Sequence, residues 1–115
     1  MAYDKALAER VRKVLGARRG VTEREMFGGL AFMLRGNMFV GILERALMAR
    51  VGTEYYERAL ASPGARQMDF TGRPMRGYVF VDASGTKSAA DLRRWVELCA
   101  EFAATLPAKV KKSRS

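Results

Sequence analysis

The residues with the clearest capacity for binding chemistry lie in one stretch, 76–83, with the sequence Arg-Gly-Tyr-Val-Phe-Val-Asp-Ala. This stretch approaches the RNA-recognition signature, in which aromatic side chains of a strand stack on bases and a basic residue lies near the phosphates. Arg76, Tyr78 and Phe80 match the signature, whereas Val79 stands where it has glycine or alanine. Aromatic side chains are also common in ordinary strands, so both interpretations stay open.

The sequence is strongly basic, with a formal net charge of +9. Residues 107–115 hold four basic residues and no acid, so we expect a domain at 1–106 followed by a disordered basic tail at 107–115. Ordinary solubility charge plus a frayed tail is the simpler interpretation of this balance. The other is contact with polyanions, which is favoured because counterions are released on association. The candidate nucleic-acid contacts are Arg76, Tyr78, Phe80, Lys109, Lys111, Lys112 and Arg114.

Residues suited to catalysis or metal binding are sparse. The chain has no histidine, which is the commonest general base and the commonest zinc ligand. Cys99, the single cysteine, lies between Val96 and Phe102 on an apolar stripe, so it is predicted to be a buried core residue and not a nucleophile. Glu23 and Glu25 have no second set of ligands to complete a metal site. We therefore expect a protein that is not an enzyme, with no catalytic residue, metal site or cofactor.

Length and composition indicate one cytoplasmic domain. With 115 residues, 49% of them hydrophobic, the chain can bury a core of its own. It has no apolar run long enough to cross a membrane, and its first residues lack the apolar region of a signal peptide. A single cysteine excludes an internal disulfide and fits a reducing compartment. We expect a cytoplasmic protein without membrane contact.

Residues 26–51 form the centre of the predicted fold. They are apolar almost throughout, with short breaks at Gly28-Gly29, Arg35-Gly36-Asn37 and Glu44-Arg45. Apolar runs separated by such breaks indicate consecutive antiparallel strands. Gly28-Gly29 permits a tight turn with positive φ, and the methionines are predicted to fill gaps in the core. The predicted strands lie at 30–34, 38–43 and 46–51, with a weaker first strand at 22–27.

Helices and one further strand flank this centre. Apolar residues at helical spacing predict an amphipathic helix at each end of the chain. The predicted fold class is therefore α+β, an antiparallel sheet of about five strands with helices on one face. The flanking elements are a helix over 3–15, a short helix at 54–60 with Thr53 as N-cap, a loop or poorly formed strand at 65–74, a strand at 75–82, and a helix from the N-cap Ser88 to Pro107.

The predicted strands carry more apolar side chains than a sheet with one wet face needs. The excess methionine and phenylalanine must be covered by a helix, by residues 65–74 or by a second chain. We expect a homodimer on this ground. Any binding surface is expected on the basic ends or on the second face of the sheet.

The residues around the first hairpin have a recognisable order. Arg24 precedes Met26-Phe27-Gly28-Gly29, a turn glycine follows at Gly36, and Met38-Phe39 opens the next strand. This order resembles the N-terminal domain of the TfoX/Sxy family of bacterial competence regulators. The strand with Tyr78 and the last helix lie where that family has its closing strand and helix. The motif residues, to which we assign structural roles, are Met26, Phe27, Gly28, Gly29, Gly36, Met38 and Phe39.

The resemblance implies a two-layer α+β domain similar to secretion-chaperone-like folds. It also implies a regulatory and not a catalytic role, exerted through contacts with a protein partner, such as a component of the transcription machinery. Full regulators of the family carry a second, C-terminal helical domain, for which 115 residues leave no room. We therefore expect a single-domain member, with nucleic-acid binding as the alternative function.

Overall fold

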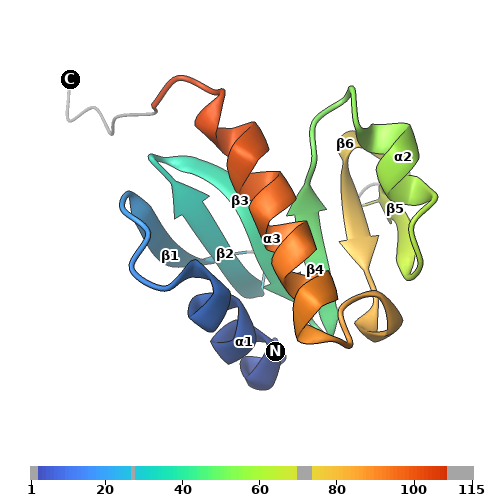
Figure 1. The fold of residues 1–115 in the computed structure, drawn as a ribbon, viewed down its shortest axis with the longest axis horizontal. Coiled ribbons are helices and arrows are strands. Elements are labelled where there is room, and N and C mark those ends of the chain that lie inside the picture. The colour runs from blue at the N-terminus through green and yellow to red at the C-terminus, as the bar shows by residue number, and fades with distance from the viewer. Residues whose placement is uncertain (1–2, 27, 70–73, 109–115) are drawn as a thin grey trace.

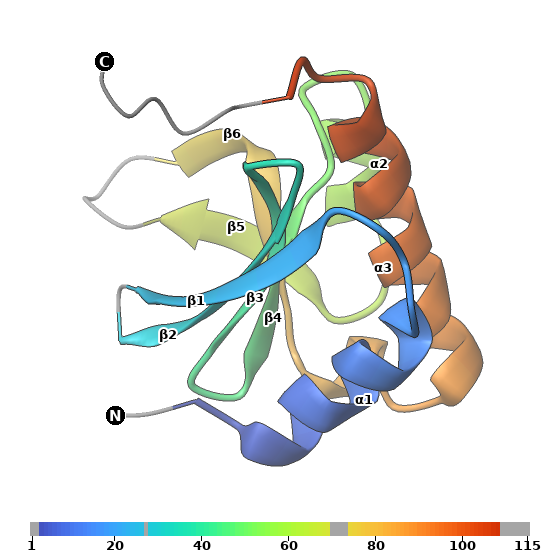
Figure 2. The same ribbon diagram turned by 90° about the vertical axis from the view of Figure 1, so that its left-hand side faces the viewer.

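The protein folds into two layers, a sheet and a layer of helices. The computed structural model describes residues 3–26, 28–69 and 74–108. All three α-helices lie on the same side of the sheet (Figures 1 and 2). This confirms the predicted α+β class. None of the helices in the described ranges is long and apolar enough to cross a membrane.

The sheet has six strands, all antiparallel to their neighbours, in the order β1-β2-β3-β4-β6-β5. The first four form a meander, and the chain then passes through α2 and β5 before β6 pairs with β4. In chain order the elements are α1 (Lys5–Leu15), β1 (Val21–Met26), β2 (Gly29–Leu34), β3 (Asn37–Leu43), β4 (Ala46–Arg50), α2 (Tyr56–Leu60), β5 (Ala65–Asp69), β6 (Pro74–Val81), the 3-10 turn η1 (Ala83–Gly85) and α3 (Ala89–Ala104).

Two predicted elements differ from the structure. The segment predicted as a loop or poorly formed strand contains β5, which pairs with β6 along the sheet edge and is the sixth strand. Its weak sequence pattern has a physical cause, because the register shifts between Gln67 and Asp69 and interrupts the alternation of faces. The short helix begins at Tyr56, after Tyr55 and not after Thr53, and no side chain caps it.

The two long helices begin at side-chain caps. Asp4 Oδ1 accepts from the backbone N–H groups of Ala6 and Leu7 at 3.0 and 3.2 Å, and α1 follows directly. Ser88 Oγ accepts from the Asp91 N–H at 3.0 Å, which confirms the predicted cap of α3. Both helices bury one apolar stripe against the sheet. The main core between the layers includes Val11, Phe32, Ile42, Leu47, Val79, Val96 and Cys99, each at most 1% exposed.

Two hairpin turns hold the helices in place, and each contains a residue other than glycine with positive φ. In the β2–β3 turn Arg35 has φ +50°, and its Nη2 donates to the carbonyl of Ala104 at 3.2 Å, at the end of α3. In the β3–β4 turn Glu44 has φ +57°, and its carbonyl accepts from the N–H of Asp4 at 2.7 Å, just before α1. Arg35 thus acts through its side chain, and Glu44 through its backbone.

This difference predicts opposite results for two glycine substitutions. Glu44→Gly is expected to raise the free energy of unfolding by about 0.5–1 kcal/mol, because it relieves the left-handed conformation and keeps the backbone bond to Asp4. Arg35→Gly gives the same relief but loses a charged donor at the end of α3, so we expect no gain or a small loss. Urea denaturation of both variants measures the difference. Equal stabilisation by both would show that the Arg35 contact contributes nothing.

Candidate functional site: the methionine face of the sheet

A second apolar cluster lies on the side of the sheet opposite the helices. We call it the methionine face. No described helix packs on this side, as Figure 2 shows. Four of its residues are buried and four are half-buried, so it is a compact surface and not a set of scattered side chains. Its members are Ala46, Met48, Met68 and Phe80, with Met38, Leu43, Met75 and Tyr78 packed against them.

One row of paired residues crosses the methionine face from edge to edge. Residues directly opposite each other in antiparallel strands point to the same side of the sheet. Small residues occupy the middle of the row, and an alanine-sized side chain at Gly41 would lie 2.6 Å from Met48 Cε, so the Met48 side chain lies over this position. Arginines occupy both ends. From β1 to β5 the row is Arg24, Ala31, Gly41, Met48, Phe80 and Arg66.

Two arginines lie directly over the aromatic rings of this face. The Arg66 guanidinium is 4.8 Å from the centroid of Phe80 and forms an ion pair with Asp82 at 3.0 Å. The Arg50 guanidinium is 5.5 Å from the centroid of Tyr78 and 5.6 Å from that of Phe102 in α3, and its Nη1 donates to the carbonyl of Met38 at 3.2 Å. Within the described ranges no carboxylate pairs with Arg50. Such contacts between a cation and a ring stabilise the arginines over the apolar cluster and leave N–H donors for a ligand.

A cavity of about 380 Å³ lies at the end of the methionine face nearest the β3–β4 turn. Ala46, Phe80 and Leu43 supply its apolar wall. Its charged residues are balanced in sign, with Glu44 and Asp82 against Arg45 and Arg66. The cavity is large enough for one or two side chains of a bound protein segment.

The structure separates the residues of the stretch that approaches the RNA-recognition signature. The N–H groups of Val51 and Gly52 both donate to the carbonyl of Gly77, at 2.8 and 3.1 Å, and Gly77 has φ +97°. Val51 and Gly52 thus both lie opposite Gly77, as in a β-bulge. The side of the sheet to which successive side chains point therefore shifts at this position. Arg76 lies against α2, 5.0 Å from the ring centroid of Tyr56, on the helix side. Tyr78 and Phe80 belong instead to the methionine face.

The other candidate contacts and the motif residues fall into three groups. Lys109, Lys111, Lys112 and Arg114 lie outside the described residues, as does Phe27. Gly28 has φ +75° and Gly36 has φ +85°, so both serve the tight turns predicted for them. The remaining motif residues line the sheet. Met26 ends β1, Gly29 begins β2, Met38 packs on the methionine face, and Phe39 is fully buried in the main core.

The residues considered for catalysis lie in separate environments. Cys99 is fully buried, as predicted, and burial raises the pKa of its thiol far above the ordinary value. Glu23 pairs with Arg12 at 2.7 Å, and this hydrogen-bonded guanidinium holds the pKa of Glu23 below its usual range. Glu25 is exposed on the same strand. No group of three potential metal ligands occurs within the described ranges.

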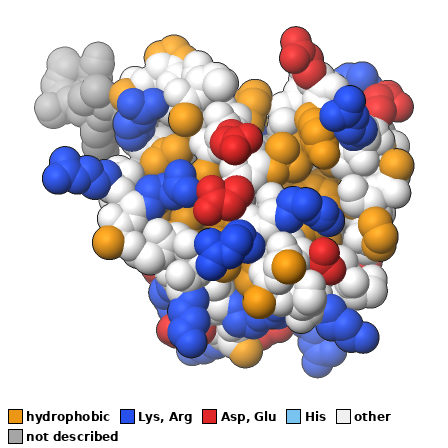
Figure 3. All heavy atoms as spheres, viewed as in Figure 1, with side chains coloured by type: hydrophobic (Ala, Val, Ile, Leu, Met, Phe, Trp, Pro, Cys, Tyr) orange, Lys and Arg blue, Asp and Glu red, His pale blue; other side chains and the backbone are white. Residues whose placement is uncertain are grey.

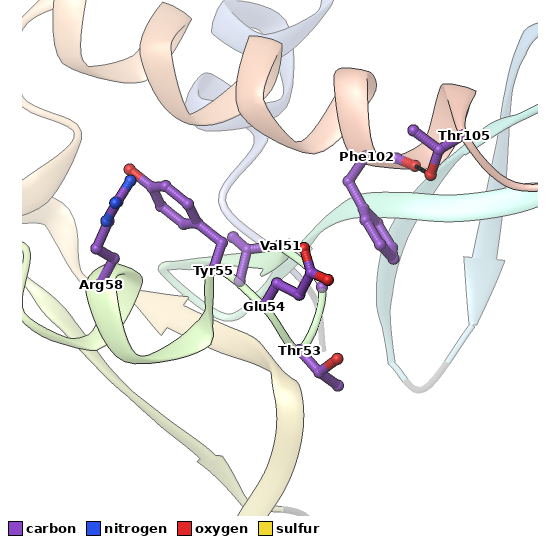
Figure 4. A pocket seen from close by; sticks show the side chains of 8 residues that line it. Val51, Thr53, Glu54, Tyr55, Arg58, Phe102 and Thr105 are labelled. Atoms are coloured by element: carbon purple, nitrogen blue, oxygen red, sulfur yellow. Dashed lines mark hydrogen bonds between the residues drawn. The ribbon is translucent and has the colours of Figure 1, made fainter.

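A second cavity lies on the helix side, between the β4–α2 connection and the end of α3 (Figure 4). Its volume is about 620 Å³. Tyr55 and Arg58, whose guanidinium is 5.3 Å from the Tyr55 centroid, lie at one side, and Phe102 lies at the other. Glu54 projects between them. The lining mixes both charges with two rings and converges on no single ligand chemistry.

The helix side of the molecule carries charges of both signs. Figure 3 shows lysine and arginine interspersed with acidic residues on this face. Several of them form exposed ion pairs, including Arg18 with Glu97 at 2.9 Å and Arg94 with Asp91 at 3.7 Å. Exposed pairs of this kind contribute little to stability, at most about 1 kcal/mol each. The helix side is therefore electrostatically mixed, in contrast to the arginines on the methionine face.

Comparisons with known proteins identify one family. No curated protein matches the chain. No solved structure matches it either. The family model described as the TfoX N-terminal domain matches residues 13–103, which include every strand and most of α3. The chain therefore belongs to the TfoX N-terminal domain family, a family of competence-related regulators.

Proposed function

We propose that this protein is a non-catalytic regulatory domain that acts by binding another protein through the methionine face. The observation that carries the proposal is the face itself, a compact apolar cluster with no described helix packed on it. Apolar surface of this kind marks sites of protein contact. The match to the TfoX N-terminal domain supports a regulatory role, and we extend it to the control of transcription or competence genes.

The composition of the face supports binding over mere packing. Four of its eight residues are methionines, whose flexible side chains adapt to different partners. Met38, Met75 and Tyr78 stay half-buried and so keep area that a partner can cover. Tyrosine and arginine are the residue types that most often dominate binding energy at interfaces, and Tyr78 lies beside Arg50 here.

Photo-crosslinking in the native cell tests the proposal. A benzoylphenylalanine at position 78 probes the methionine face, and the same residue at position 55 is the matched control, because Tyr55 is a half-buried tyrosine on the helix side. We expect discrete protein adducts from position 78 and none from position 55. Adducts from position 55 alone, or from neither position, would contradict the proposed contact surface.

Transcript levels test the regulatory part separately. In a strain lacking the gene, we expect the wild-type protein to restore a defined set of transcripts. Met38→Gln, which places an amide on the half-buried rim of the methionine face, is expected to restore them poorly. Leu98→Gln is the control, because Leu98 is a half-buried apolar residue of α3 on the helix side. An unchanged transcript profile in the deletion strain would refute the regulatory role.

A further inference from the structure

We propose that the methionine face recognises an acidic protein segment with large apolar side chains, whose carboxylates pair with Arg24, Arg50 and Arg66. This inference rests on the proposed function and adds the chemistry of the partner. The apolar part of the recognition follows from the cluster around Met48 and Phe80. The charged part follows from the positions of the three arginines.

The arginines surround the apolar cluster and carry unused capacity for binding. Arg24 is exposed at one end of the cross-strand row and forms no ion pair within the described ranges. Arg50 lies near the rings of Tyr78 and Phe102 and donates to a backbone carbonyl, but it pairs with no described carboxylate. Arg66 pairs with Asp82, yet its side chain stays 53% exposed. These three guanidinium groups outnumber the single paired acid, Asp82, so the charge around the apolar cluster is positive. Guanidinium groups favour bidentate pairing with carboxylates.

A second copy of the chain fits this surface less well than an acidic partner. Two methionine faces in contact would bring arginines toward arginines. Two copies could also pair through their β1 edges across a two-fold axis, but this arrangement too brings like charges together. In such a continuous antiparallel sheet, residues opposite each other must point to the same face. With Arg24 opposite its own copy, Glu23 lies opposite Glu25, and like charges directly opposite are destabilising. Charge complementarity therefore selects a partner of opposite sign.

The length of the row gives the size of the segment. Neighbouring strands lie about 4.8 Å apart, so the ends of a six-strand row are on the order of 24 Å apart along the sheet. A helix rises 1.5 Å per residue, so about 16 residues span this distance. The probe is therefore a 16-residue amphipathic peptide, with leucine and phenylalanine on one face and four glutamates distributed toward its two ends.

Methyl NMR of protein labelled at the methionine methyl groups measures binding at the site itself. Single Met→Leu variants assign the seven methionine signals. Titration with the glutamate peptide is expected to shift the signals of Met38, Met48 and Met68, and added salt is expected to weaken binding. The same peptide with lysine in place of glutamate is expected to bind at least 10-fold more weakly. Equal binding by both peptides would overturn the role of charge.

A triple variant and a matched control triple test whether the effect of charge on peptide binding comes from the three arginines of the methionine face. Arg24→Gln, Arg50→Gln and Arg66→Gln together are expected to weaken glutamate-peptide binding at least 10-fold. The control triple, Arg19→Gln, Arg58→Gln and Arg93→Gln, removes the same charge from exposed positions outside the methionine face, and we expect less than a 3-fold effect. Equal weakening by both triples would show that net charge alone drives binding. The peptide swap on the unaltered protein does not depend on how the variants fold.

Two further NMR experiments test whether nucleic acid or a second copy of the chain covers the methionine face instead. A 16-nucleotide single-stranded DNA that shifts the same methyl signals more strongly than the peptide would overturn the protein partner in favour of nucleic acid. Methyl shifts that depend on protein concentration alone would show that a second copy covers the face. Absence of any shift at saturating peptide would reject the acidic segment. If the crosslink from position 78 persisted in that case, the proposed function would stand with a partner of different chemistry.

Discussion

Gly29→Ala is expected to lower the free energy of unfolding by about 3 kcal/mol or more, whereas Gly28→Ala lowers it by about 1 kcal/mol. A β-carbon at Gly29 would overlap the backbone carbonyl oxygen of Ile42. Ile42 is paired with Leu30 on one side and Leu47 on the other, so this carbonyl cannot move without disturbing three strands. At Gly28 nothing lies near an added β-carbon, and the cost is only that of φ +75°.

The pair of variants separates two roles that the sequence presents as one. A Gly-Gly pair in a hairpin suggests a turn requirement at both positions. The structure assigns the turn to Gly28 and close packing between strands to Gly29. Urea denaturation measures both changes, and the larger one is a substantial part of the stability of a small domain, typically about 5–15 kcal/mol. A cost at Gly28 equal to or above that at Gly29 would contradict this assignment.

The central strands were predictable because their apolar runs end at residues of types that favour turns. Arg35-Gly36 and Glu44-Arg45 interrupt the apolar runs, and β2, β3 and β4 begin and end within one residue of the predicted bounds. β5 was harder, because Arg66 and Gln67 are polar and the register shifts just after them. The Thr53 cap was wrong because a good capping residue type does not determine where a short helix begins when packing on the sheet decides it.

The candidate site depends on pairings that no local pattern reveals. The sequence shows methionines at several positions, but only the insertion of β6 between β4 and β5 brings Met48, Phe80 and Arg66 into one row. The bulge at Gly77 is equally hidden, since a lone glycine in a strand does not show which neighbours change face. For this reason Arg76 and Tyr78, neighbours in an apparent motif, lie on opposite sides of the sheet.

The thiol of Cys99 is expected to react with a disulfide reagent at least about 1,000-fold more slowly in the folded protein than in urea. The side chain is 0% exposed on the inner stripe of α3, so a reagent reaches it only when the domain opens. Burial, opposed by a backbone contact from Arg50, also raises the pKa of the thiol, so little thiolate forms in the folded state. Fast labelling of the folded protein would contradict a purely structural role and reopen nucleophilic chemistry at this residue.

The same burial predicts a loss of stability in alkali. The unfolded thiol ionises above about pH 8.5, while the folded thiol, with its raised pKa, stays protonated. The contribution of the buried thiol to the free energy of unfolding is therefore fully present below about pH 8.5. Above this pH the free energy of unfolding falls by about 1.4 kcal/mol per pH unit, until the pH reaches the pKa of the folded thiol. Cys99→Ala removes this dependence at a small cost for the cavity it leaves. Between pH 8.5 and 10 the wild type should lose about 2 kcal/mol more than this variant. Because lysines and tyrosines titrate in both proteins, the difference between them isolates the buried thiol, and parallel pH profiles would show that Cys99 ionises without unfolding.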